Sequence, residues 1–262
     1  MAVAGSRASL IGLALILGCS VLPLDSLIFF PDRYVPDPPA GIEERTITTS
    51  DGVRLNAWYA AGPPGAPTLV WSHGNGGNIA GRVDVQLALA ARGLAVLAYD
   101  YRGYGRSEGR PSEGGVYRDA EAAYDSERAR GVPAERIVAF GESLGGAVAI
   151  RLATERPCAG VGVVSTFTTI QDVARRHYGT VAILAGNRFD SLSRVRRLGV
   201  PLFVAHGDED EVVPFALGER LFAAANEPKR FLRAAGAHHN DVFDVPGLLD
   251  AVAAFAHEVT HG

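Results

Sequence analysis

The chain alternates between short apolar runs and segments in which apolar residues recur at helical spacing. The apolar runs lie at residues 68–74, 94–101, 137–142, 161–166 and 202–207, and none of them shows a polar alternation. Strands that are buried on both faces have this pattern, and such strands belong to parallel sheets. The pattern therefore predicts a mostly parallel sheet.

Segments with helical periodicity separate the apolar runs. We predict helices at 81–91, 117–130, 144–155 and 215–224, then a strand at 229–234 and a helix at 248–259. Strand and helix in alternation favour an α/β fold, in which helices cover both faces of an open sheet. In such folds, ligands bind beyond the carboxyl ends of the strands.

An antiparallel hairpin is expected before the parallel strands. Residues 42–61 alternate between apolar and polar on both sides of Asp51-Gly52, which is a typical hairpin turn. Residues 31–41 are rich in proline and polar residues, which is typical of a stiff spacer. The folded domain is therefore expected to span residues 42–262.

The N-terminus has the pattern of a secretory signal. Arg7 precedes an apolar stretch at 10–18, which is shorter than the roughly 20 residues that span a bilayer. The sequence ILGCS around Cys19 resembles a bacterial lipoprotein signal. Two alternatives follow: a signal peptide over 1–18 with a lipidated tether over 19–41, or an uncleaved N-terminal anchor. Both predict a membrane-associated, extracytoplasmic protein.

Composition and charge narrow the function classes. The chain has 262 residues, 47% of them hydrophobic and 21% charged, with a net charge of −4. No basic stripe appears, so we do not expect nucleic acid to be a partner. No histidine cluster has metal-ligand spacing and no phosphate-binding or dinucleotide fingerprint occurs, so neither a metal nor a cofactor is expected.

One serine stands where strand character gives way to helix character. Gly141-Glu142-Ser143-Leu144-Gly145 matches the nucleophile elbow G-x-S-x-G, with an apolar strand before it and a small-residue helix after it. The glycines leave space in a tight turn, and the helix N-terminus favours developing negative charge. The alternative is a glycine-rich packing corner with an incidental serine.

A serine hydroxyl needs an adjacent base, and in folds with this elbow an acid and then a histidine follow in the chain. The stretch HGDEDEVVP offers four carboxylates at residues 208–211, and GAHHND offers two histidines at 238–239. Because neighbouring side chains point in different directions, one histidine is expected to face the serine. The residues alone do not choose among the four carboxylates.

Five stretches carry a resemblance. From about residue 42 to the end, SHGNGGN, DYRGYGRSEG, GESLGG, HGDEDEVVP and HHND are similar to the α/β-hydrolase superfamily, in the abhydrolase-domain branch that includes membrane-attached depalmitoylases. The resemblance implies Asp210 as the acid and His239 as the base, with Asp208 a loop-shaping carboxylate. It also implies an α/β-hydrolase fold with a short cap at about 167–199 and no cofactor.

The expected chemistry is hydrolysis of an acyl ester or thioester through Ser143, His239 and Asp210. The N–H groups of Leu144 and Asn75 are expected to bind the oxyanion. His73, Asp100 and Arg102 are expected to support the surrounding loops. Two rival functions remain open, an aminopeptidase-like hydrolase with the same three residues and a non-catalytic binding protein on the same scaffold.

Overall fold

The structure is a computed structural model that describes residues 28–261. The predicted signal segment and Cys19 lie outside the described residues. Within the described part of the chain, no helix is both long and apolar enough to cross a bilayer.

An eight-stranded sheet forms the centre of the molecule, and its strands lie in the order β10-β9-β8-β7-β4-β6-β3-β2. Only β2 and β3 break the parallel pattern, since β2 pairs antiparallel with β3 and β3 pairs antiparallel with β6. The predicted mostly parallel sheet with an N-terminal hairpin is confirmed. The strands are β2 (Ile42–Thr48), β3 (Arg54–Ala60), β4 (Thr68–Ser72), β6 (Ala95–Tyr99), β7 (Ile137–Glu142), β8 (Gly160–Val164), β9 (Leu202–Gly207) and β10 (Lys229–Ala234).

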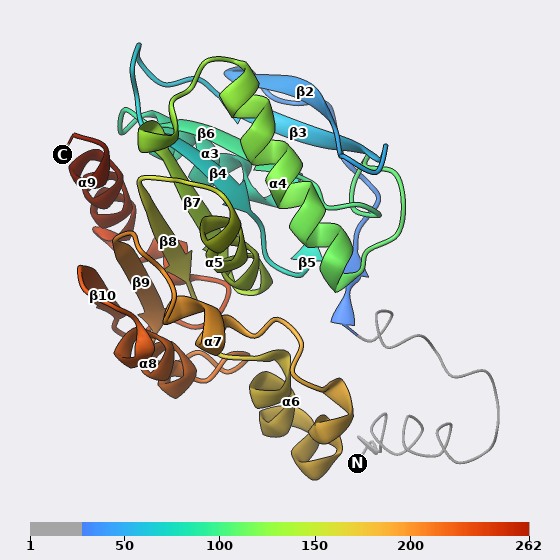
Figure 1. Ribbon diagram of the computed structural model, residues 1–262, viewed down its shortest axis with the longest axis vertical. Helices are drawn as coiled ribbons and strands as arrows, with labels where there is room; N and C mark the ends of the chain where they lie inside the picture. Colours follow the sequence, from blue (N-terminus) through green and yellow to red (C-terminus); the bar gives the residue numbers. More distant parts are fainter. Residues whose placement is uncertain (1–27, 262) are drawn as a thin grey trace, which may run out of the picture.

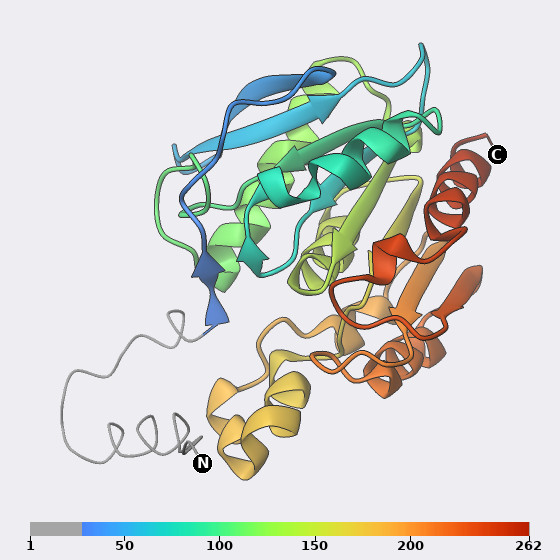
Figure 2. The ribbon, with the colours of Figure 1, turned by 180° about the vertical axis from the view of Figure 1, so that it is seen from behind.

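Helices cover both faces of this sheet, as the alternation of elements predicts. Figure 1 shows α4 (Glu113–Ala129), α5 (Leu144–Glu155) and α8 (Phe215–Ala224) on one face. Figure 2 shows α3 (Val83–Ala90) and α9 (Leu248–Thr260) on the other. Two hydrophobic cores result, one on each side of the sheet. Short 3-10 turns also lie between these elements: η1 (Ile79–Arg82), η2 (Ala134–Arg136) and η4 (Val242–Asp244).

The segment between β8 and β9 projects from the body of the molecule, at the end where the short strand β1 (Phe30–Pro31) also lies (Figure 1). It contains α6 (Ile170–Tyr178), η3 (Gly179–Ala185) and α7 (Ser191–Val195). No residue of α6 is buried, whereas Phe189 is fully buried between η3 and α7. We refer to residues 167–199 as the cap.

Helix α4 begins at Glu113, four residues before the predicted start. The Ser112 side chain accepts a hydrogen bond from the Gly115 N–H and so caps the helix. Two consecutive glycines hid this first turn, because glycine is a poor helix former. Gly115 has a packing reason: a Cβ there would collide with the buried Arg102 side chain. Arg102 in turn joins Asp119 on α4 to Asp51 in the hairpin turn.

The residues directly before the expected spacer at 31–41 lie against the domain. β1 (Phe30–Pro31) pairs in parallel with β5 (Gly76–Gly77) in the loop after β4. Ile28 and Phe29 are only 7% and 4% exposed, and the Phe29 ring lies 6.1 Å from that of Phe189. The burial of these two apolar side chains explains why the segment docks despite the prolines that follow.

Candidate active site

The turn between β7 and α5 presents Ser143. Its backbone has φ 50° and ψ −117°, a conformation that costs free energy for any residue with a Cβ. Gly141 and Gly145 allow the turn to be this tight. A Cβ on Gly141 would overlap the Gly145 carbonyl, and one on Gly145 would overlap the Ser72 carbonyl of the neighbouring strand. The two glycines therefore have the steric role that the elbow pattern predicts.

The strained turn is held by the next strand. The Ser143 N–H donates to the Val164 carbonyl at 2.8 Å, and the Ser143 carbonyl accepts from the Thr166 hydroxyl at 2.8 Å. Both partners lie at the carboxyl end of β8. The serine is thus fixed above the same end of the sheet where parallel α/β folds bind their ligands.

His239 reaches the serine from the loop after β10. Its Nε2 lies 3.1 Å from Ser143 Oγ, and its Nδ1 lies 2.8 Å from Asp210 Oδ2. An ionised carboxylate only accepts hydrogen bonds, so Nδ1 carries the proton and Nε2 is left to accept from the serine hydroxyl. The fold thus brings three residues together that are up to 96 positions apart.

Asp210 is almost fully buried and is surrounded by donors. Its Oδ1 accepts from the N–H groups of Val212 and Val213, at 2.9 and 2.7 Å. Its Oδ2 lies 2.8 Å from His239 and 3.3 Å from His206. Burial opposes ionisation, but the hydrogen bonds from His206 and His239 outweigh it and hold the pKa of the Asp210 carboxyl well below its usual range.

The neighbouring candidates point elsewhere. Asp208 accepts from Arg233 at 2.8 Å and from the Gly236 N–H at 2.6 Å, so its carboxylate shapes the loop. The half-exposed His238 side chain faces Glu209 and Glu211. The structure therefore brings Asp210 and His239, and not Asp208 and His238, to the serine.

His206 was not singled out by sequence reasoning. Its Nε2 lies 2.9 Å from the Val213 carbonyl, so Nε2 carries a proton and also faces Asp210. A Cβ on Gly218 would collide with its ring, which shows how closely α8 approaches. The signal in the sequence is the i,i+4 spacing of His206 and Asp210 at the end of a strand.

Two backbone N–H groups, one in the nucleophile turn and one in the loop after β4, have no acceptor among residues 28–261. One belongs to Leu144, the first residue of α5, and the other to Asn75 in the loop after β4. The Gly74 N–H differs, because it donates to the Glu142 carboxylate at 2.8 Å. Of Gly74 and Asn75, only Asn75 therefore keeps its N–H free for a ligand within the described residues.

His73 and Asp100 form a buried pair behind this loop. The His73 Nδ1–H donates to the Gly74 carbonyl at 2.6 Å, and its Nε2 lies 3.7 Å from Asp100 Oδ1. Burial lowers the pKa of His73 to about 3 and raises the pKa of Asp100 to about 7. At neutral pH the histidine is uncharged, and Asp100 binds the Ile79 N–H rather than a substrate.

Asp100→Asn is expected to improve stability more at high pH than at low pH. In the unfolded chain this carboxyl ionises near pH 4, whereas in the folded chain it ionises near pH 7. Raising the pH from about 4 to above 7 therefore lowers the free energy of unfolding of the wild type, because the unfolded chain releases the Asp100 proton more readily than the folded chain does. The asparagine of the variant does not titrate, so the variant does not lose stability in this way. The melting temperature of the variant minus that of the wild type should be more positive at pH 8.5 than at pH 5.5. A difference that falls over this range would contradict the assignment.

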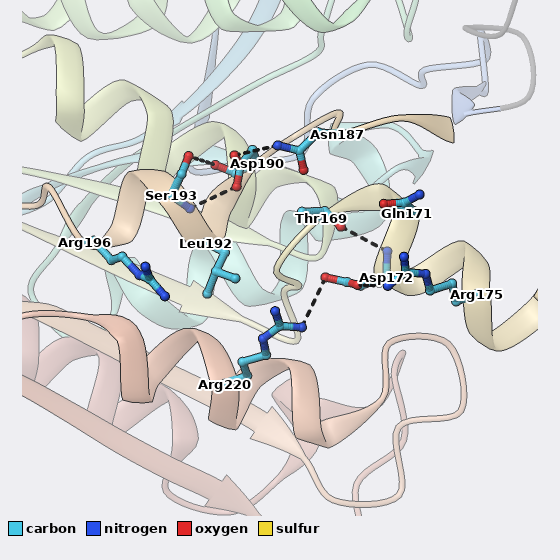
Figure 3. A pocket seen from close by; sticks show the side chains of 10 residues that line it. All are labelled: Thr169, Gln171, Asp172, Arg175, Asn187, Asp190, Leu192, Ser193, Arg196 and Arg220. Carbon is cyan, nitrogen blue, oxygen red and sulfur yellow. Dashed lines mark hydrogen bonds and ion pairs between the residues drawn. The ribbon is translucent and has the colours of Figure 1, made fainter. Parts of the chain in front are cut away.

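A polar cavity of about 330 Å³ lies between the cap and α8 (Figure 3). Arg175, Arg196 and Arg220 surround it, and Arg220 forms an ion pair of 3.7 Å with Asp172. Neither Ser143 nor either of its two partners lines this cavity. The cavity is therefore separate from the site formed by Ser143, His239 and Asp210. Within residues 28–261, no group of three or more His, Cys, Asp or Glu side chains is arranged to hold a metal ion.

Comparison with known proteins defines the class. The esterase Pf2001 of Pyrococcus furiosus has the same fold, with a TM-score of 0.75 and 20% identity over 88% of this chain and 99% of the esterase. An α/β hydrolase of Vibrio vulnificus matches with a TM-score of 0.72 and 20% identity, over 83% of this chain and 81% of that one. Residues 65–194 match the family model Hydrolase_4, described as serine aminopeptidase, S33. The chain has the fold of these α/β hydrolases.

The chain belongs to one family with proteins of mycobacteria and enterobacteria. It is 40% identical to the uncharacterized protein Rv2307c of Mycobacterium tuberculosis, over 88% of this chain and 86% of the relative. It is 30% identical to the uncharacterized protein YfhR of Escherichia coli, over 83% of this chain and 81% of the relative.

Proposed function

We propose that the protein is a serine hydrolase that cleaves carboxylic esters or thioesters through an acyl-enzyme intermediate. The observation that carries the proposal is the hydrogen-bonded chain from Ser143 through His239 to Asp210. Asp210, His239 and Ser143 are aligned as acid, base and nucleophile in this order.

Each group has a task in the proposed reaction. His239 Nε2 takes the proton of Ser143 as Oγ attacks the acyl carbonyl, and Asp210 stabilises the imidazolium that forms. The N–H groups of Leu144 and Asn75 bind the oxyanion, since neither is used within the described residues. His239 then protonates the leaving group. Water repeats the attack with His239 as base, and the free acid leaves.

The test combines a probe with a substrate panel. A fluorophosphonate probe should label the purified wild-type chain at Ser143, which a binding protein without a reactive serine would not allow. p-Nitrophenyl esters, acyl thioesters and aminoacyl p-nitroanilides then separate the reaction classes. We expect turnover of esters or thioesters. Absence of both labelling and turnover would reject the proposal.

An aminopeptidase-like activity is the second candidate. It is favoured by the description of the matching family model, serine aminopeptidase. The same three residues would perform the amide cleavage, with His239 protonating the leaving amine. Turnover of the aminoacyl anilide at a rate that exceeds ester turnover would favour this candidate.

We further propose attachment to the outer side of a bacterial membrane, through a lipidated Cys19 or an uncleaved N-terminal anchor. The motif at Cys19 supports lipidation, which holds a protein firmly when more than one chain is attached. Mass spectrometry of the N-terminal peptide from membranes should find a modified Cys19 as the first residue. A peptide that begins at Met1 or Ala2 with an unmodified cysteine would favour the anchor.

A further inference from the structure

The docked N-terminal segment touches the loop that carries the Asn75 N–H. The Asn75 amide Nδ2 donates to the Ile28 carbonyl, and its Oδ1 accepts from the Phe30 N–H at 3.4 Å. The Tyr104 hydroxyl donates to the same Oδ1 at 2.9 Å and accepts from the Phe30 N–H at 3.2 Å. Both ends of the Asn75 side chain are thus held by main-chain groups of residues 28–30, with Tyr104 as a third partner.

The segment is itself fixed on both sides. Its strand β1 pairs with β5 directly after Asn75, and the Asp32 N–H donates to the Gly77 carbonyl at 3.3 Å. The Asp32 carbonyl accepts from the Gly105 N–H at 2.8 Å, in the loop that carries Tyr104. Phe29 anchors the segment by burying its ring against Phe189.

The opposite side of the loop rests on the nucleophile turn. Glu142, which precedes Ser143, accepts from the Gly74 N–H at 2.8 Å and from Arg82 Nε at 2.6 Å. Arg82 also donates to the Gly76 carbonyl at 2.9 Å. The peptide that carries the Asn75 N–H therefore lies between Glu142 on one side and the N-terminal segment on the other. Its orientation depends on both.

We infer that the main chain of residues 28–31, through the Asn75 side chain and Tyr104, positions the Asn75 N–H as an oxyanion donor. The N-terminal segment is in this way a positioning element of the active site, although it lies far from Ser143 in the sequence. The inference rests on the proposed function, because an oxyanion forms only if Ser143 attacks a carbonyl.

Displacing the Asn75 N–H is expected to lower kcat strongly, because an oxyanion donor stabilises the transition state only when it is correctly placed. Removing one donor costs about 10²–10³ in kcat, and a displacement of about 1 Å has a cost of similar order. Loss of one support should displace the Asn75 N–H only partly. We therefore expect losses in kcat of about tenfold to a hundredfold, with KM little changed, because the contact strengthens in the transition state.

The test compares Phe30→Pro with Phe30→Ala in the full-length chain. Both variants remove the exposed ring of Phe30, but only proline removes the N–H that donates to Asn75 and Tyr104. We expect kcat for a p-nitrophenyl ester to be at least about tenfold lower in the proline variant than in the alanine variant. Melting temperatures establish that both variants are folded at the assay temperature.

A second readout separates a positioning role from a general structural one. In a thionoester, sulfur replaces the carbonyl oxygen and fits an oxyanion donor poorly. The preference for the ester over the thionoester should therefore shrink in Phe30→Pro relative to Phe30→Ala. Equal kcat values in the two variants, or equal losses with both substrates, would overturn the inference while leaving the proposed function intact. A wild-type chain without labelling or turnover would instead reject the proposed function and the inference with it.

Tyr104→Phe keeps the test decisive if the proline variant does not fold. It removes one hydroxyl and leaves the ring beside His73 and Tyr101, at centroid distances of 5.3 and 5.7 Å. We expect Tyr104→Phe to lower kcat and to reduce the preference for the ester over the thionoester, as in Phe30→Pro but by a smaller factor. Wild-type values for both quantities in a folded Tyr104→Phe variant would count against the inference.

Discussion

Ser143→Ala is expected to abolish fluorophosphonate labelling and to lower ester turnover by about three orders of magnitude or more. The alanine keeps the backbone of the turn but removes the atom that attacks, and His239 is left without a proton to take. The remaining groups retain only the catalysis that binding and the N–H groups supply. Initial rates on the purified full-length chain measure the effect, with circular dichroism as the control for folding.

A second variant at the same position separates chemistry from stability. Ser143→Gly also removes the hydroxyl, but glycine adopts the observed φ of 50° without a steric cost. It should be as inactive as Ser143→Ala and have the higher melting temperature. A folded Ser143→Ala variant with a tenth of the wild-type turnover would show that Ser143 is not the nucleophile.

His239→Ala is expected to lower kcat by about 10³-fold or more, whereas the matched variant His238→Ala should retain most of the activity. His239 links Ser143 to Asp210, while His238 faces Glu209 and Glu211 at the surface. Asp210→Asn and Asp208→Asn form a second pair. In Asp210→Asn, the Val212 and Val213 N–H groups should hold the amide oxygen at the Oδ1 position, so the NH2 group faces His239 Nδ1. This NH2 group is a donor, so it favours the wrong tautomer of His239 and does not stabilise the imidazolium. Greater loss in the folded His238 or Asp208 variant would reverse the assignment.

The fold could be predicted because the apolar runs are long and free of polar residues. Such runs have few other uses in a chain without membrane-spanning helices among its described residues. The position of Ser143 followed from the elbow pattern, because only glycine fits beside the Ser72 and Gly145 carbonyls. Local sequence determines this part of the site almost completely.

The choice of Asp210 and His239 over their neighbours needed a resemblance to known proteins. The structure adds the physical reason for the carboxylate. Asp208 is engaged by Arg233 and the Gly236 N–H, and Asp210 by the Val212 and Val213 N–H groups. These partners depend on where β9 and β10 end relative to each other. Residue types and spacing do not contain that information.

The docking of residues 28–31 could not be predicted for a similar reason. The sequence indicated a tether over residues 19–41 that ends in a proline-rich spacer at 31–41, and it gave no sign of a contact between residues 28–31 and the domain. The decisive contacts are made by two apolar side chains and by main-chain groups, and main-chain groups leave no trace in a sequence. The role of Glu142 could not be predicted either. Glu142 occupies a variable position of the elbow pattern, so the pattern did not indicate that its carboxylate accepts from the Gly74 N–H.

Both open edges of the central sheet carry charged side chains. β2 has Glu43, Glu44 and Arg45 at one edge, and β10 has Arg230 and Arg233 at the other. A strand from a second copy would have to pair beside these charges and remove water from them, which costs free energy. The two edges therefore oppose runaway strand-by-strand polymerisation.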